Sequence, residues 1–547
     1  MSLRRESIVD LQPLRHESRM DFGAGSRAGI ATLTSLNPRI NAWFLLELQW
    51  RASHESAFYH LENPDRLSTR VLLGGPQIGG LILESRSGQS RCGLWAEGIE
   101  NPLERARRTG LPYAPLCGGR LYLRNVVAGT YTRLERVTDF LRDHVWGGDR
   151  IVAFVRKQAF QDRFMERNAE PIATPSGARA GSDSASPRSA QIAPGSATGI
   201  WPEHLGIDVV SSGTTLESGR WYRVNGIRDV YFSALQPEMI PARILSSDPQ
   251  LVDHLDTVEA GAVDYLVAFD LTKFELGFAL GTDHPRLDWS GRELPDMHDS
   301  SLPGPDGIAD AAPLARSGMV SPSATGRTVA AFAGGFKRVH GAFRYGALAR
   351  QNHASHYGFI EEGVVFSTLQ PGLATLFVLN DGTIDAKTWS AADARLLPEI
   401  RYARQNGVPL LEHSGSSEGV PGLLVRQWGA GNWSGSADAR LRTLRAGICL
   451  QQTATRRFLL FGYFSTATPS AMVRVFQAYG CQYAMHLDMN ALEHTYLALY
   501  AHGDGEVIVQ HLIEGMAEVD RKGGGGLAPR FLSFPDDRDF FYLMRRD

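Results

Sequence analysis

The sequence lacks the features of a nucleic-acid or membrane protein. Its 56 Lys and Arg are balanced by 59 Asp and Glu, so the formal net charge is only −3. No basic run with interleaved aromatic residues occurs, and no apolar stretch approaches the roughly 20 residues that a membrane span needs. The start of the chain is charged and no apolar segment follows it, which predicts neither a secretion signal nor an anchor. Nucleic acid is therefore not an expected partner.

Cysteine is scarce as well. The chain has four, Cys92 and Cys117 in the first part and Cys449 and Cys481 in the last, and none has the spacing of a structural zinc site. Composition leaves open whether they are buried thiols or form one bridge in each part. Cys449 and Cys481 each lie in or beside a predicted strand and flank the helix that joins these strands. For this pair we expect a Cα separation under about 7 Å, close enough for a disulfide.

With 547 residues, the chain has room for more than one domain. Residues 168–199 are dominated by Ala, Ser, Pro and Gly and have no aromatic residue, so they cannot bury enough apolar surface to offset the entropy of ordering. We therefore predict a disordered tail over 1–26, an N-terminal module of unknown role over 27–167, a disordered linker over 168–199 and a C-terminal domain over 200–547.

The predicted fold class is α+β in two domains. In the N-terminal module, apolar runs predict strands and one segment has helical periodicity, which indicates a small α/β or α+β unit. The expected strands cover 42–48, 70–73, 79–83, 120–127 and 151–155, and the expected helix covers 132–144. In the C-terminal domain we expect a mixed sheet flanked by helices. Its expected elements include strands at 201–209, 221–232, 265–271, 329–333 and 408–411, hairpins at 357–366 and 376–389, a long surface loop at 283–327 and a helix at 391–405.

The most informative stretch is 465–500. Thr468 followed by Pro469 is typical of a helix start, apolar residues then recur at helical spacing, and Gly480 suits a left-handed C-terminal cap. The apolar run 483–487 is too short for a helix and predicts a buried strand that ends at Asp488. In open α/β sheets ligands bind at the carboxyl ends of strands, so Asp488 is the leading candidate site residue.

From residue 200 onward the order of elements resembles the phosphodiester glycosidase family. Leu487–Leu492 matches the position of its Leu-Asp-Gly-Gly-Gly-Ser motif, and Gly334-Gly335-Phe336 matches its Asn-Gly-Gly-Phe-Phe strand end. Arg442 or Arg445, before Ala446-Gly447-Ile448, resembles its Arg-Thr-Ala-Ile-Gly strand.

The resemblance implies cleavage of the bond between an anomeric carbon and a phosphate oxygen, in a sugar-1-phosphodiester or related linkage of a glycan or exopolysaccharide. It implies no cofactor, a carbohydrate or sugar-phosphate partner and an extracytoplasmic location. The catalytic candidates are Asp488, Glu493, His486 and His413, with His494 as a further acid or base. The candidates for substrate binding are Gly334, Gly335, Arg442, Arg445 and Trp433. We expect Asp488, the glycine pair, His413 and one of the two arginines to share a cleft, and Asp488→Asn to reduce turnover while stability stays nearly unchanged.

Two alternatives remain open. Because Met489, Asn490, Ala491 and Leu492 replace the glycines and serine of the family motif, the protein is alternatively a glycan-binding member without activity. A weaker alternative is a metal-dependent hydrolase in which His486, Asp488 and His494 are the ligands, since alternate strand residues face the same way. His353 and His356 form a second, weaker metal candidate. The glycine pair also suits a simple tight turn or bulge.

Overall fold

The structure is a computed structural model. It describes the following residues: 7–23, 28–95, 101–132, 162–168, 186–196, 199–211, 213–290, 294–338, 343, 346–351, 357–415, 418–427, 440–503, 506–523 and 526–546. Except for Thr132, the expected helix at 132–144 and the expected strand at 151–155 lie outside the described residues. The same is true of three candidate site residues, His353, His356 and Trp433, and of residues 169–185 of the expected linker. No helix in the described ranges is long and apolar enough to cross a membrane.

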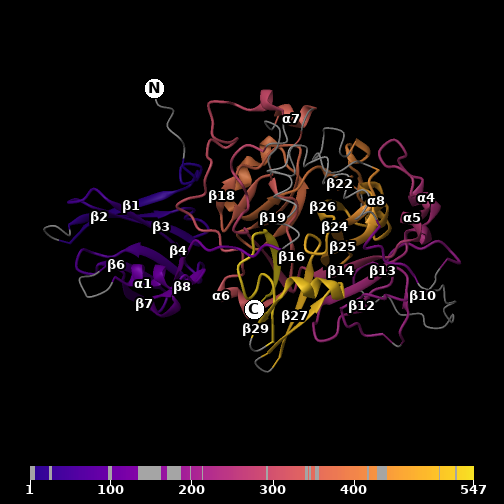
Figure 1. Cartoon of the computed structure of the whole chain (residues 1–547), viewed down its shortest axis with the longest axis horizontal. Helices are drawn as coiled ribbons and strands as arrows, with labels where there is room; N and C mark the ends of the chain where they lie inside the picture. Colours follow the sequence, from indigo (N-terminus) through magenta and orange to yellow (C-terminus); the bar gives the residue numbers. More distant parts are fainter. Residues whose placement is uncertain are drawn as a thin grey trace.

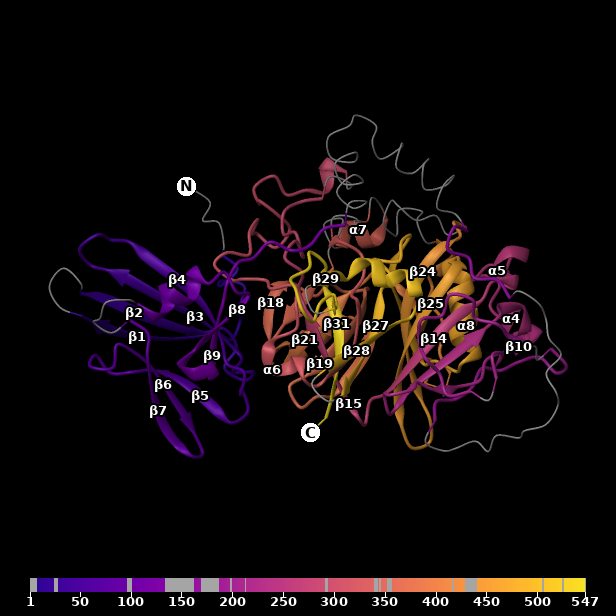
Figure 2. The same cartoon turned by 60° about the horizontal axis from the view of Figure 1, so that its bottom comes forward.

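The first part of the chain is a group of antiparallel strands that lies to one side of the rest (Figures 1 and 2). One sheet has the order β1-β2-β3-β4-β9-β8, and a smaller sheet has the order β5-β6-β7. The strands are β1 His16–Phe22, β2 Gly29–Ser35, β3 Trp43–Trp50, β4 Ser56–Glu62, β5 Thr69–Leu73, β6 Gly80–Ser85, β7 Gly88–Gly93, β8 Tyr113–Leu116 and β9 Leu121–Arg124. Helix α1, Pro102–Arg108, packs on β8 and β9, and the core of this part draws only on residues between Phe22 and Leu123. This part is mostly β rather than α/β, because its apolar runs pair as neighbouring antiparallel strands.

The start of the chain differs from the expected disordered tail. Residues 16–22 form β1, and Ile8 is fully buried. The side-chain Nε2 of Gln12 donates to the carbonyl of Val365 at 2.9 Å, and its Oε1 accepts from the backbone N–H of Val365 at 2.8 Å. The amide thus pairs with the edge strand β18, Val364–Ser367, as a neighbouring peptide group would. Polar tail residues are ordered here by contacts with a segment far along the chain.

The rest of the chain is built on three large sheets. The first has the order β12-β13-β14-β25-β24-β26-β22-β23, the second β15-β31-β16-β27-β28 and the third β18-β17-β21-β19-β20. Strands of the first sheet are β12 Tyr222–Arg223, β13 Val230–Leu235, β14 Asp264–Asp270, β22 Pro409–Glu412, β23 Val420–Pro421, β24 Thr443–Gln452, β25 Arg457–Ala467 and β26 Tyr483–Met489. Those of the second are β15 Phe274–Ala279, β16 Thr328–Ala333, β27 Leu497–Gly503, β28 Glu506–His511 and β31 Phe540–Arg545. Those of the third, besides β18, are β17 Phe359–Glu361, β19 Ala374–Leu379, β20 Ile384–Thr388 and β21 Ile400–Gln405.

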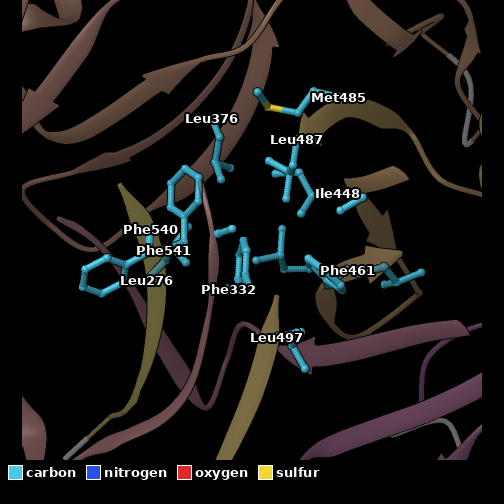
Figure 3. Packing of buried hydrophobic residues seen from close by; sticks show 14 of the residues in the cluster. Leu276, Phe332, Leu376, Ile448, Phe461, Met485, Leu487, Leu497, Phe540 and Phe541 are labelled. Atoms are coloured by element: carbon cyan, nitrogen blue, oxygen red, sulfur yellow. The ribbon is translucent and has the colours of Figure 1, made fainter. Parts of the chain in front are cut away.

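The main hydrophobic core lies between these sheets. Phe461 of β25 packs against Phe332 of β16 with ring centroids 5.3 Å apart, and Phe332 in turn contacts Phe541 of β31. Figure 3 shows these rings together with Leu487 of β26 and Leu376 of β19. Burial of this apolar surface is the main force that holds the sheets together.

The remaining elements are short. Two small sheets pair β10 Gly199–Ile200 with β11 Leu216–Glu217, and β29 Arg521–Gly523 with β30 Gly526–Ala528. The other helices are α4 Ala242–Leu245, α5 Thr257–Gly261, α6 Pro322–Thr325, α7 Ala347–Gln351 and α8 Pro469–Ala478. Short 3₁₀ helices are η2 Cys117–Gly119, η3 Pro237–Met239, η4 Pro295–Met297, η6 Ala391–Glu399, η7 Val425–Gln427 and η8 Glu514–Val519.

Helix α8 and strand β26 match the prediction from sequence. The Thr468 hydroxyl accepts from the Ala471 N–H, Pro469 opens the helix, and Gly480 has φ +67° just beyond its end. Phe476 of α8 packs edge-on against Phe464 of β25 at 5.2 Å, so the helix covers the face of the first sheet opposite the core. Cys449 and Cys481 form a disulfide with a Cα separation of 5.9 Å, which confirms that prediction. Cys92 and Cys117 form a second disulfide.

Three features differ from the sequence prediction. Every ladder between the named strands is antiparallel, so the expected mixed sheet is wrong. The expected helix 391–405 is instead η6 followed by β21, because Pro398 cannot continue a helix and β21 pairs with both β17 and β19. Residues 201–209 form only isolated bridges rather than a strand.

A buried ionic cluster joins the first part of the chain to the third sheet. Arg124 of β9 contacts Glu62 of β4 at 2.6 Å and Glu361 of β17 at 3.5 Å, and all three side chains are nearly inaccessible. Burial raises the pKa of Glu361 to about 7, against the opposing effects of Arg124 and of the N–H of Leu280, while Glu62 raises it further. Two carboxylates thus share one guanidinium.

We expect the stability of the protein to fall as the pH rises from about 4.5 to about 7. In this window folded Glu361 keeps a proton that the unfolded chain has already released, so deprotonation favours unfolding. Glu361→Gln should flatten this slope, as measured by urea unfolding between pH 5 and pH 8. The matched control is Glu399→Gln, which removes the partly exposed partner of Arg39 at the same junction and should leave the slope unchanged. An equal slope in wild type and Glu361→Gln would contradict the assignment.

Candidate active site

Charged side chains from five segments meet where β16, β21 and β26 end and where β31 begins. The segments are the start of the loop after β15, the turn after β16, the end of β21, the end of β26 with the turn after it, and the four residues before β31. We call this group the buried charge cluster. Its members are His284, Lys337, Arg404, Asp488, His494, Asp537, Arg538 and Asp539, all buried except His494, which is partly buried.

Asp488 lies at the centre of the first branch of the cluster. Its Oδ2 accepts from Nη1 of Arg538 at 2.6 Å, and Nη2 of Arg538 donates to Nε2 of His494 at 2.8 Å. A guanidinium can only donate, so Nε2 of His494 is the acceptor and its Nδ1–H donates to the carbonyl of Met489 at 2.9 Å. His494 is therefore a neutral imidazole with both nitrogens occupied. Glu493 lies beside it, with Oε1 3.4 Å from His494 Nε2.

Asp539 organises the second branch. One oxygen accepts from Nε of Arg404 at 2.8 Å, and the other is 2.6 Å from Nδ1 of His284. Burial alone would raise the pKa of the Asp539 carboxyl, but the charge of Arg404 and the hydrogen bond from His284 outweigh it and hold that pKa far below its usual range. Burial lowers the pKa of His284 despite the opposing effect of Asp539. The stable state at neutral pH is thus an ionised carboxylate with a neutral imidazole.

The glycine pair makes room for this branch. Pairing of Ala333 with Phe540 brings Gly334 beside Asp539, and a Cβ on Gly334 would overlap the Asp539 carboxylate. Gly335 has φ +138°, and a Cβ there would collide with the guanidinium of Arg404. Both glycines are required by the close approach of buried charged side chains, in addition to any role in ligand approach.

Two further cations follow the glycine pair. Lys337 contacts Asp537 at 3.2 Å, and Arg338 contacts Asp306 at 2.6 Å. Asp306, like His284, belongs to the long loop 283–327. This loop, expected to run over the surface, instead contributes buried charged residues.

His486 and Arg445 form a layer next to the cluster. Nη1 of Arg445 donates to Nε2 of His486 at 3.3 Å, Nδ1 of His486 lies 3.1 Å from the carbonyl of Leu487, and the imidazole stacks on Phe336 at 5.0 Å. Burial lowers the pKa of Arg445 to about 9. His486, like His494, has both nitrogens in hydrogen bonds, so these contacts hold it in place and leave neither nitrogen open to a substrate.

Two predicted site residues, His413 and Arg442, are not part of the buried charge cluster. β22 runs antiparallel to β26, so its carboxyl end meets the amino end of β26, where His413 stacks on Tyr483 at 5.4 Å. Five residues of extended chain, roughly 17 Å, separate Tyr483 from Asp488. Arg442 is on the same side as Asp488 but forms ion pairs with Asp162 and Asp256.

The metal alternative finds no support in side-chain geometry. His486 and His494 direct their Nε2 atoms to different arginines, and Asp488 is paired with Arg538. Among the residues that the structure describes, no group of three or more His, Cys, Asp or Glu side chains is arranged to hold a metal ion.

Sequence reasoning missed His284, Arg404 and the run Asp536-Asp537-Arg538-Asp539. That run carried a signal: four consecutive charged residues directly precede the apolar strand β31. Charges that adjoin a buried strand are either at the surface or paired in the interior. Arg404 was hidden by the incorrect helix at 391–405.

Comparisons with known proteins give only remote matches. No family model and no curated protein matches the sequence. Among solved structures, the catalytic domain of zebrafish N-acetylglucosamine-1-phosphodiester alpha-N-acetylglucosaminidase, auto-inhibited by its pro-peptide, matches with a TM-score of 0.30 and 11% identity, over 59% of this chain and 85% of that one. A hypothetical protein from Synechocystis matches with a TM-score of 0.28 and 9% identity, over 97% of this chain and 99% of that one. A putative exported protein from Burkholderia pseudomallei has a TM-score of 0.19 and 11% identity, over 52% of this chain and 74% of that one.

Proposed function

We propose that the protein is a hydrolase that cleaves a sugar-1-phosphodiester or a related glycosidic linkage of a glycan or exopolysaccharide. The observation that carries the proposal is the buried charge cluster itself. It combines a carboxylate at the end of a strand, Asp488, with two cations in the same cluster, Arg538 and Lys337. Buried charges are costly, and a concentration of them drawn from distant segments is typical of functional sites.

The chemistry of the proposed reaction suits these groups. Departure of a phosphomonoester leaves positive charge on the anomeric carbon, which a carboxylate such as Asp488 stabilises. The leaving phosphate needs compensating positive charge, which Arg538 and Lys337 supply. Glu493 is partly exposed beside His494 and is the candidate to exchange protons with solvent. Arg445 acts indirectly in this scheme, because it positions His486.

The altered motif after Asp488 is compatible with this proposal. Asn490 has φ +79°, a left-handed conformation that asparagine adopts more readily than most residues with a side chain. Its side chain accepts from the Thr443 hydroxyl at 3.0 Å, and its N–H donates to the Leu444 carbonyl at 2.8 Å. Asn490 thus supports a turn for which glycine is the usual residue.

The second candidate is a glycan-binding protein without activity. It is favoured by the ion pairing of the cluster, in which Asp488, Asp537 and Asp539 each already contact a cation. Met489 and Ala491 are also buried where the resembling family has glycines, which limits the approach of a ligand to the backbone.

A substrate panel tests the proposal. We expect the full chain to convert at least one methyl phosphodiester of a hexose-1-phosphate or N-acetylhexosamine-1-phosphate, in one anomeric form, to free sugar and methyl phosphate. Phosphorus NMR distinguishes the diester from the monoester, and calorimetry measures binding of the same compounds. Binding without conversion would favour the second candidate, and neither binding nor conversion would contradict both.

A further inference from the structure

We propose that Nε2 of His284 is the general base that takes a proton from the attacking water in this hydrolysis. The inference rests on the proposed function and assigns a residue that neither the strand-end pattern nor the family resemblance indicated. His284 comes from the loop after β15, far in sequence from Asp488.

The tautomer of His284 follows from its partner. Asp539 is held ionised by Arg404, and its backbone carbonyl is fixed by the N–H of Gly334 at 2.9 Å. An ionised carboxylate only accepts, so Nδ1 of His284 must carry the hydrogen in the 2.6 Å contact. The lone pair of the neutral ring is therefore on Nε2. A carboxylate that orients an imidazole in this way is the arrangement by which hydrolases prepare a histidine base.

His284 also differs from the other imidazoles of the site because one of its ring nitrogens makes no hydrogen bond to the described residues. The side chain is 1% exposed, and its Nε2 has no hydrogen-bond partner among the residues that the structure describes. Both nitrogens of His486 and of His494 are occupied, as described above. A buried polar atom without a partner is rare and calls for an explanation. The explanation we infer is that this nitrogen accepts a proton from the attacking water.

Burial, more than the charges around it, keeps His284 neutral. Lys337 and Arg538 disfavour a second positive charge, Asp539 favours it, and the guanidinium of Arg316 lies against the same residue through a 3.1 Å bond to the His284 carbonyl. Burial outweighs Asp539, and the two cations add to its effect, so the pKa of His284 is below its usual value and the ring is unprotonated at Nε2 at neutral pH.

The proposed step is balanced as follows. The water oxygen bonds to the anomeric carbon as the bond between that carbon and the phosphate oxygen breaks. The electron pair of the broken bond leaves with the phosphomonoester. One water proton moves to Nε2 of His284, and His284 then releases it to solvent. The products are a free sugar and a phosphomonoester.

The test uses His284→Asn in the full chain. The asparagine amide keeps a donor where Nδ1 was, so the contact with Asp539 and the thermal stability should be retained, while the basic nitrogen is lost. We expect kcat to fall by about 10²- to 10⁴-fold on the converted diester. The acid limb of the pH profile that His284 causes in wild type should disappear. The matched control is His413→Asn, at the opposite end of β26, which should keep wild-type activity.

A second readout does not depend on turnover. In protein with ¹⁵N-labelled histidine, the signal missing from His284→Asn should show a neutral ring protonated at Nδ1 at pH 7. A ring protonated at Nε2, or at both nitrogens, would overturn the inference. A wild-type rate and pH profile in His284→Asn would also overturn the inference. Lack of turnover of any diester by wild type would instead refute the proposed function, and with it the catalytic role of His284.

Discussion

Replacement of Asp488 by asparagine should lower turnover of the converted diester by about 10²- to 10³-fold, the cost typical of losing one electrostatic stabiliser of a transition state. The substitution keeps the shape of the side chain and removes the charge that would face the anomeric carbon. In a glycan-binding protein the same change would alter affinity alone, because no chemical step depends on the charge. The measurement is kcat and KM by phosphorus NMR, with the dissociation constant from calorimetry.

The structure changes the expected stability of this variant. The sequence suggested that Asp488→Asn would be nearly neutral for folding, but Asp488 is paired with Arg538 in the interior. Loss of its charge removes the carboxylate that accepts from Nη1 of the buried Arg538 guanidinium, so we expect a loss of about 3 kcal/mol in the free energy of unfolding. Activity must therefore be expressed per folded molecule.

Two further variants separate the catalytic effect from the folding effect. Asp488→Asn combined with Arg538→Gln removes both charges and should recover part of the stability without recovering turnover. Asp385→Asn removes a partly exposed carboxylate that pairs with Arg457 at 3.1 Å and should change neither property by much. Full activity in Asp488→Asn, or recovery of activity in the double variant, would contradict a catalytic role for Asp488.

Arg404→Met should produce the largest loss of stability. Arg404 is fully buried, and besides Asp539 it contacts the carbonyl of Phe336 and the side chain of Asn406. Its removal leaves His284 as the one remaining side-chain partner of the buried Asp539 carboxylate among the described residues, and uncompensated buried charges cost about 3–5 kcal/mol. Urea unfolding at pH 7 measures the effect.

The pH dependence of Arg404→Met provides an independent check. In wild type the depressed pKa of Asp539 stabilises the fold above the unfolded carboxyl pKa, and this contribution is lost as the pH falls toward the folded pKa. Without Arg404 the pKa of Asp539 should rise, so this acid-side dependence should weaken. Arg39→Met, which breaks a partly exposed pair with Glu399, is the control and should cost at most about 1 kcal/mol. A similarly small cost for Arg404→Met would show that the cluster contributes little to folding.

Local features of the fold were readable from consecutive residues. The caps of α8 at Thr468 and Gly480, the buried strand β26 and the hairpin β17–β18 follow from hydrogen bonds and apolar periodicity within about a dozen residues. The Cys449–Cys481 pairing was also predicted, although the two cysteines are 32 residues apart and both β25 and α8 lie between them. The sequence also drew attention to Asp488 and to Gly334-Gly335, which the fold brings to the same buried charge cluster.

What the sequence by itself determined about this protein is therefore its local elements and two parts of its candidate site. Only the tertiary structure decided that the strands pair antiparallel, that His413 lies at the far end of β26, and that His284 and Arg404 meet at Asp539. These contacts join residues 255 and 135 positions apart. The physical reason is that a capping hydroxyl or an apolar stripe acts on its own neighbours in the chain, whereas a buried ion pair exists only where sheet order and register bring two distant segments together and exclude water from both.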